Sequence, residues 1–268
     1  MNSFNNNLAV LLLISIPSII VANPQSRIVG GEPASPGEFS FQVSLRNSGF
    51  GHICGGAIVS PSLVVTAAAC TDPRSPSIDE VVAGSLKRTE NVTWQQVRTV
   101  ERFVVHPGYN GTTLDNDLSL LFLTEPYEFN ENISSIRLPS AYIETAPKPV
   151  VLSGWGSIQY GEPMFEDLMK VTLDTYTDSV CEEWVEQYVR PEILCSGADE
   201  GGRGGCQGDA GSPLITQGNN TYIAAVLSHF PCPRPDCCGI VGPNDQSTEL
   251  SFYIEWILEQ SRLYGGGL

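Results

Sequence analysis

Apolar residues along this chain occur in short runs that are separated by turn residues. The runs are rich in β-branched and aromatic residues, and Gly, Pro and Asn stand between them. Many short strands with this punctuation are typical of an all-β barrel or sandwich. The pattern covers residues 39–123 and begins again at residue 150, which predicts two halves with a boundary near residues 134–149. The expected strands are 41–45, 57–59, 63–66, 81–83, 98–105, 118–123, 150–152, 170–173, 213–215 and 222–227.

Helical character is confined to the end of the sequence, at residues 252–263. Its apolar residues are Phe252, Ile254, Trp256, Ile257 and Leu258. We therefore predict a single α-helix, at the C-terminus of an otherwise β-rich chain.

The first 22 residues have the features of a secretory signal peptide. Residues 8–21 are mostly apolar and are followed by the small residue Ala22. A membrane-spanning helix needs about 20 apolar residues, so this run is short for an anchor. Residues 1–7 depart from the usual signal because they contain no Lys or Arg. We expect a protein that is secreted to the extracellular space and that has no membrane association once residues 1–22 are removed.

Composition limits the classes of partner. Lys and Arg number 14 against 30 Asp and Glu, which gives a formal charge of −16. An acidic surface repels nucleic acid and anionic membranes, so neither is expected as a partner. Four Asn-x-Ser/Thr sequences support the secretory route, and the candidate glycosylation sites are Asn91, Asn110, Asn132 and Asn219.

The eight cysteines predict disulfides and no metal site. An even number of cysteines in a secreted chain favours disulfides, and no Cys-x-x-Cys pair stands at zinc-binding distance from a histidine. We expect neither a metal nor a cofactor. Spacing alone does not decide which cysteines pair.

A candidate processing site follows the signal peptide. Arg27 precedes the β-branched pair Ile28 and Val29 and then two glycines, which keep the backbone extended and accessible. Cleavage would remove residues 23–27 as a short propeptide and leave residues 28–268 as the mature domain. From these residues alone, an ordinary linker is an equal alternative.

Six motifs follow one another along the chain. They are RIVGG at 27–31, HICGG at 52–56, DNDLSLL at 115–121, GWG at 154–156, CQGD at 206–209 and YIEWI at 253–257. In this order they resemble the trypsin/chymotrypsin family of serine endopeptidases, from residue 28 to the terminal helix. The resemblance implies two six-stranded Greek-key β-barrels with a C-terminal α-helix, and a functional site in the cleft between the barrels.

The resemblance also locates the catalytic Ser-His-Asp triad of the family. The base position holds Ala69, the nucleophile position holds Ala210, and only Asp117 is retained. A methyl group can neither take up a proton nor attack a carbonyl. Ser212 lies two residues beyond the nucleophile position and should point elsewhere. The chain's histidines fall on structural family positions or, in one case, on a tryptophan of the substrate cleft: His52, His106 and His229.

Two further features are implied by the resemblance. The backbone N–H groups of Gly208 and Ala210 correspond to the family's oxyanion hole. Asp209 corresponds to the aspartate that pairs with the new ammonium group after cleavage between Arg27 and Ile28. A buried carboxylate without its partner is costly, so this pair has a structural explanation as well as a regulatory one.

The substrate pocket of the family is altered in this sequence. Its base is Gly204, where a trypsin has an aspartate, so we expect no charge there to hold a basic side chain. Phe230 stands near a position that is normally glycine and is expected to fill the pocket. The remaining pocket positions are Ser228 and Gly239.

Family spacing implies three disulfides, which are Cys54–Cys70, Cys181–Cys195 and Cys206–Cys232. This assignment leaves the adjacent residues Cys237 and Cys238. The alternatives for them are a vicinal bridge, a bond to another molecule and exchange with Cys232. A local intramolecular bond is favoured over a redox function.

The main hypothesis is a secreted pseudoprotease, a serine protease homologue without catalytic activity. It would act as a monomer by binding a protein or peptide, as a cofactor, decoy or inhibitor in a proteolytic cascade. The alternative is an active trypsin- or chymotrypsin-like endopeptidase, which would need an unrecognised base and nucleophile. Engineered alanines at 69 and 210 are a third interpretation, but Ser212, His229 and the Cys237–Cys238 pair also depart from the family.

Overall fold

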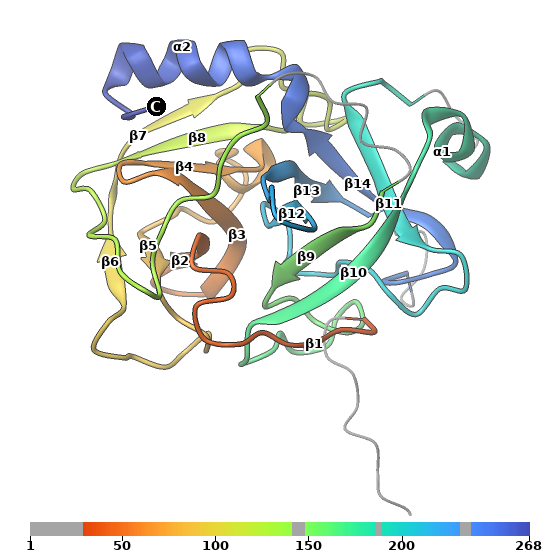
Figure 1. The fold of residues 1–268 in the computed structure, drawn as a ribbon, viewed down its shortest axis with the longest axis horizontal. Coiled ribbons are helices and arrows are strands. Elements are labelled where there is room, and N and C mark those ends of the chain that lie inside the picture. Colours follow the sequence, from red (N-terminus) through yellow and green to blue (C-terminus); the bar gives the residue numbers. More distant parts are fainter. Residues whose placement is uncertain (1–28, 141–147, 186–188, 231–236) are drawn as a thin grey trace, which may run out of the picture.

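A computed structural model describes most of the chain, in four segments: residues 29–140, 148–185, 189–230 and 237–268. The predicted signal peptide at 1–22, the propeptide at 23–27, Ile28 and Cys232 lie outside the described residues. The described part is built mainly of strands, in two antiparallel sheets that lie next to each other (Figure 1).

The first sheet has the strand order β6-β5-β2-β3-β4-β8-β7. Its strands include the β-branched and leucine-rich runs of the sequence, which suit a pleated, buried surface. Only Thr99 separates β6 from β7, so the chain itself joins the two ends of the sheet and closes a barrel of six strands, one of them bent. The strands are β2 (Gln42–Asn47), β3 (Gly51–Ser60), β4 (Leu63–Thr66), β5 (Glu80–Ala83), β6 (Gln96–Arg98), β7 (Val100–Val105) and β8 (Ser119–Leu123).

The second sheet has the strand order β1-β10-β11-β14-β13-β12-β9. Since β9 also pairs with β10, six of these strands form a closed ring, and β1 is added outside it with Glu32 opposite Lys170. The prediction of two six-stranded barrels is therefore confirmed. The strands are β1 (Glu32–Pro33), β9 (Val150–Gly154), β10 (Met169–Tyr176), β11 (Ile193–Ala198), β12 (Pro213–Thr216), β13 (Ile223–His229) and β14 (Gly242–Glu249).

The C-terminal helix α2 (Ile254–Tyr264) follows the second barrel but packs against the first. A 3₁₀ turn, η2 (Leu250–Phe252), leads into it from β14, and in Figure 1 the helix lies alongside β7 and β8. Ile257 is fully buried in the core of the first barrel, and the Tyr264 ring meets Phe122 edge-on at 5.5 Å. The last helix therefore holds the two barrels together.

The prediction of a single helix is wrong, because a second helix, α1 (Asp178–Val185), precedes β11. Cys181 is its one buried residue in the described structure. Its apolar residues follow helical spacing, but over only eight residues, which is too short a run for the pattern to indicate a helix.

Two disulfides are those that the family resemblance implies. Cys54 in β3 is bonded to Cys70 in the 3₁₀ turn η1 (Ala68–Cys70), and Cys181 in α1 is bonded to Cys195 in β11.

The third predicted disulfide is wrong. Cys206 is bonded to Cys238, with the Cα atoms 5.2 Å apart, and not to Cys232. Cys238 is therefore not in a vicinal bridge with Cys237, although Cys237 is itself disulfide-bonded. Adjacent cysteines point in different directions along a chain, so spacing could not decide which of them faces Cys206.

We expect the double variant Cys206→Ala/Cys238→Ala to lose roughly 3–4 kcal/mol of unfolding free energy, because the bond closes a long loop in the unfolded chain. Urea unfolding without reductant measures the loss, and the matched control is Cys54→Ala/Cys70→Ala, which opens a shorter loop. Non-reducing peptide mapping should recover Cys206 joined to Cys238. Recovery of Cys206 joined to Cys232 would show that the assignment is wrong.

Candidate functional site

Asp117 is held at the junction of the two barrels, just before β8. Its side chain is completely buried. Oδ1 accepts a hydrogen bond from the backbone N–H of Ala69 at 2.7 Å, and Oδ2 accepts one from the Ser228 hydroxyl at 2.6 Å. Burial raises the pKa of Asp117, and these hydrogen bonds oppose that rise. Both carboxylate oxygens are thus engaged by groups other than an imidazole.

Ala69 and Ala210 lie in segments that remain well anchored. Ala69 is in η1, next to the Cys54–Cys70 bond, and its carbonyl accepts a hydrogen bond from Ser75 Oγ at 2.6 Å. The carbonyl of Ala210 accepts the Gly55 N–H at 2.8 Å across the barrel interface. The backbone at both predicted triad positions is fixed, while the side chains there are methyl groups.

The side chains of His52 and His106 contact residues other than Asp117. His52 is buried, with Nδ1 2.7 Å from Ser44 Oγ and Nε2 3.0 Å from the carbonyl oxygen of Gly208, and burial lowers its pKa to about 4. The ring of His106 packs edge-on against Tyr253 and Trp256. Neither imidazole contacts Asp117 in the described structure.

A different set of polar groups surrounds Asp117. The Ser228 hydroxyl that donates to Asp117 lies 3.2 Å from Nδ1 of His229, so a carboxylate, a hydroxyl and an imidazole form a chain. Ser228 is 4% exposed, which leaves its oxygen little access to a substrate. Ser212 is fully buried, and its Oγ lies 3.4 Å from Gln42 Nε2.

The backbone donors of the predicted oxyanion hole are free. Within the described segments, neither the Gly208 nor the Ala210 N–H donates a hydrogen bond. Gly208 has a φ of +99°, and a Cβ there would come within 2.7 Å of the Met164 sulfur, so the turn requires glycine. Two neighbouring N–H groups therefore remain able to bind an acceptor.

A carboxyl group that the sequence analysis did not predict lies beside Gly204, the predicted pocket base. A Cβ on Gly204 would lie 3.3 Å from both carboxylate oxygens of Asp245, which is completely buried in β14. Asp245 Oδ2 accepts the Gly205 N–H at 2.7 Å, whereas Oδ1 has no hydrogen-bond partner in the described structure. Burial raises the pKa of Asp245 to about 8, so this carboxyl group becomes charged only in alkaline solution or when a cation pairs with it. Asp245 comes from β14, which is distant from Gly204 in the sequence. The one sign of it in the sequence was a single acidic residue within a polar segment.

Of the other predicted pocket residues, Gly239 lies next to Gly204. Gly239 approaches Gly204 closely, with its Cα 3.1 Å from where a Gly204 Cβ would be. Phe230 and Val29 both pack against a buried cluster of Cys206, Cys237 and Cys238, which contains the Cys206–Cys238 disulfide.

Asp209, the predicted partner of a new N-terminus, is also completely buried. It accepts the backbone N–H groups of Gly156 at 2.8 Å and Cys206 at 3.0 Å, and burial raises its pKa to about 7. Val29 forms a β-bridge with Gly204, which brings the chain just after Ile28 into this region. Among the described residues no Lys, Arg or His is paired with Asp209.

The remaining candidate residues lie at the surface. Asn91, Asn110 and Asn219 are exposed, and Asn132 is half-buried. No group of His, Cys, Asp and Glu in the described segments could hold a metal ion. A search of the described residues found no helix with the length and apolar character of a membrane span.

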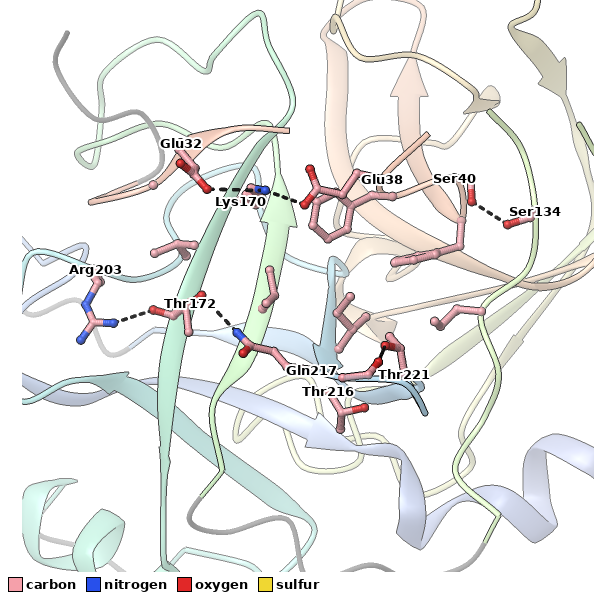
Figure 2. Close-up of a pocket in the computed structure, with 18 of the residues that line it drawn as sticks. Glu32, Glu38, Ser40, Ser134, Lys170, Thr172, Arg203, Thr216, Gln217 and Thr221 are labelled. Atoms are coloured by element: carbon pink, nitrogen blue, oxygen red, sulfur yellow. Dashed lines mark hydrogen bonds and ion pairs between the residues drawn. The ribbon is translucent and has the colours of Figure 1, made fainter. Parts of the chain in front are cut away.

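A separate groove contains none of the candidate triad residues. It has a volume of about 990 Å³, and Figure 2 shows Lys170 between Glu32 and Glu38 on one side of it. Lys170 Nζ lies 3.5 Å from Glu32 and 2.5 Å from Glu38, so its charge is already neutralised. This groove is distinct from the site around Asp117.

Comparison with known proteins establishes the family of the chain. The family model described as Trypsin matches residues 28–250. The chain belongs to the trypsin family. It is 35% identical over 239 residues to Trypsin-1 of Astacus astacus, covering 86% of this chain and 98% of that protein.

Two other relatives have similar sequence identity to the chain. Trypsin V-A of Rattus norvegicus is 30% identical over 246 residues, covering 92% of this chain and 94% of the relative. The Suppressor of tumorigenicity 14 protein homolog of Bos taurus is 35% identical over 247 residues, but the match covers only 28% of that longer protein. The family of this domain is therefore shown by full-length relatives and by a domain of a larger protein.

Removing the buried charge of Asp245 should make stability less dependent on pH. Burial raises the pKa of Asp245 to about 8, above its unfolded value, so its contribution to stability falls as the pH rises toward 8. We expect Asp245→Asn to gain roughly 1–3 kcal/mol of unfolding free energy over the native protein near pH 9, and to gain little near pH 4. Urea unfolding at both pH values measures the difference.

The control is Asp79→Asn at the surface. A hydrogen bond from the Ser48 N–H lowers the pKa of Asp79, so this variant should lose stability above the unfolded pKa and should not gain it. A constant difference between Asp245→Asn and the native protein across the pH range would contradict the assignment of a buried, unpaired carboxylate.

Proposed function

We propose that the protein is a secreted, catalytically inactive member of the trypsin family that acts by binding a polypeptide. The observation that carries the proposal is the environment of Asp117. Its Oδ1 accepts a backbone N–H from Ala69, the residue at the base position, and the residue at the nucleophile position is Ala210. Proton transfer and nucleophilic attack have no side chain at either place.

The groups that remain suit binding. The free N–H groups of Gly208 and Ala210 can hold a peptide carbonyl, and the buried Oδ1 of Asp245, unpaired in the described segments, can pair with a cationic side chain that reaches it. Such a site would hold an extended polypeptide without cleaving it. This supports a role as cofactor, decoy or inhibitor in extracellular proteolysis, with a monomer as the binding unit.

Cleavage after Arg27 would complete this site. Val29 is bridged to Gly204, so the new ammonium group on the preceding residue, Ile28, would be within reach of Asp209. The buried carboxylate of Asp209 has only backbone donors in the described structure. Pairing with the ammonium would favour the charged form of Asp209 and order the turn that bears Gly208. In this proposal the propeptide controls a binding cleft.

An active endopeptidase is the second candidate, favoured by one observation. The Ser228 hydroxyl lies between Asp117 and His229, at 2.6 and 3.2 Å, which brings the three residue types of a triad together. The buried position of Ser228 and its hydrogen bond to Asp117 oppose a role as nucleophile. An active-site label distinguishes the two candidates directly.

The protein cleaved after Arg27 should not react with a fluorophosphonate probe, whereas Ala69→His/Ala210→Ser should be labelled. Restoring both groups is necessary because loss of either one alone removes nearly all activity, a factor of about 10⁶ in a studied protease. Fluorescence gels of both proteins give the result. Labelling of the native protein that Ser228→Ala abolishes would establish the active alternative.

Binding of p-aminobenzamidine, an aromatic amidinium, tests the charge at the pocket base. We expect Asp245→Asn to weaken its binding at least about tenfold, because the variant keeps the shape of the side chain and removes the charge. The ligand's fluorescence on titration gives both affinities. Asp199→Asn, which alters an exposed carboxylate, is the control. Equal affinities in all three proteins would rule out Asp245 as the cation site.

A further inference from the structure

A second cavity lies beside His229, the residue that follows Ser228 at the end of β13. It has a volume of about 410 Å³, and its lining includes His229 from β13, Gln246 from β14, and Leu114 and Arg190 from two loops. Asp245 and Gln246 are consecutive in β14, so their side chains point to opposite faces of the strand. The cavity is therefore separate from the place where Asp245 approaches Gly204.

Gln246 supplies an unused hydrogen-bond donor to this cavity. Its side chain is 6% exposed, and its Nε2 has no hydrogen-bond partner in the described structure. Leaving a buried polar group unsatisfied costs about 1–3 kcal/mol. A polar group of a ligand that accepts a hydrogen bond from Nε2 would recover that cost.

His229 stands directly beside Gln246. The two residues are opposite one another in the β13–β14 ladder, after a bulge between Leu227 and His229. Opposite residues in antiparallel strands have Cβ atoms about 4.5–5.5 Å apart. One ligand group can therefore reach both side chains.

The contacts of Ser228 determine which hydrogen-bonding role His229 presents. The Ser228 hydroxyl gives its single proton to the carboxylate of Asp117, so toward His229 it can only accept. The proton of the neutral imidazole then lies on Nδ1, and Nε2 is an acceptor. Burial lowers the pKa of His229, which keeps the ring neutral.

The charged groups of the lining are already paired. Arg190 lies 2.9 Å from Asp115 and 3.9 Å from Glu192. A charged ligand group would find no free counter-ion among these residues, whereas a neutral group that carries both a donor and an acceptor would satisfy Gln246 and His229 together.

We propose that this cavity binds a primary carboxamide, the side chain of an Asn or Gln in the polypeptide that occupies the cleft. The amide oxygen accepts from Gln246 Nε2, and the amide NH₂ donates to His229 Nε2. A carboxylate would place its oxygens against the acceptor on His229, and an apolar side chain would leave the donor of Gln246 buried and unpaired. The inference rests on the proposed function, since it names what the same cleft selects.

The test uses capped tetrapeptides of the form acetyl-X-X-X-Arg-amide, in which each X is varied in turn among Gln, Asn, Glu, Lys and Leu. The arginine is the anchor for Asp245. At one of the three positions we expect Gln or Asn to bind the native protein, cleaved after Arg27, at least about tenfold more tightly than Leu or Glu, because a site built for hydrogen bonds rejects groups that cannot make them. Calorimetry or fluorescence polarisation gives the affinities.

The variant Gln246→Glu keeps the size of the side chain and replaces its donor with an acceptor. The preference for Gln or Asn should fall at least about tenfold, and Lys should become the favoured residue. The matched control is Gln217→Glu, an exposed glutamine in the separate groove of Figure 2, which should change nothing. Circular dichroism confirms that both variants are folded.

Nitrogen-15 NMR of the His229 ring provides a readout without any ligand. The expected state is neutral with the proton on Nδ1. A proton on Nε2 would give the cavity two donors, and together with a preference for Glu it would overturn the proposal.

Failure of this inference can be told from failure of the proposed function. Peptides that bind through their arginine, and lose affinity in Asp245→Asn, but show equal affinity for every X would refute the carboxamide pocket alone. A preference for Leu would do the same. Absence of binding by every peptide would refute both the pocket and the binding cleft.

Discussion

A strand of buried polar residues in the wall of the second barrel, β14, is the constraint on which the cavity at His229 and the approach of Asp245 to Gly204 both depend. All eight residues of β14 are buried, although its sequence, GPNDQSTE, contains no large apolar side chain. The strand is held there because β11 and β13 pair with its two edges and satisfy its backbone groups. Alternation along it then directs Asp245 to one face and Gln246 to the other.

Burying this polar strand leaves several of its side-chain atoms without hydrogen-bond partners among the described residues. Four consecutive residues of β14 carry a buried side-chain atom without a hydrogen-bond partner in the described structure, namely Asn244, Asp245, Gln246 and Ser247. Natural proteins break the rule of polar satisfaction mainly at functional sites. Two left-handed residues, Leu114 and Asn116, flank the same region with φ values of 58° and 52°. Unsatisfied groups and left-handed backbone thus gather in β14 and in the loop that lines the same cavity, while the predicted triad positions 69 and 210 hold alanine.

Sequence reasoning succeeded where burial and apolar character coincide. The runs at 63–66 and 118–123 became the buried strands β4 and β8, and the terminal helix was found from its apolar face. Sequence reasoning failed for segments in which burial and apolar character do not coincide. β14 is buried but polar, α1 is helical but buries little, and the partner of Cys206 depends on which way one of two neighbouring cysteines points. Asp245 was missed for the same reason, because only the folded barrel brings it to Gly204.

The position of the C-terminal helix has a consequence for the order of folding during synthesis. The first barrel is encoded first, yet its core includes Leu250 and Ile257, and Gly266 lies against Leu63 and Phe122. A ribosome delivers these residues after the strands of both barrels. The first barrel must therefore wait, with part of its core uncovered, until the second barrel has been translated and the end of the chain has returned to it. Of the two barrels, the one that is made first is thus completed second.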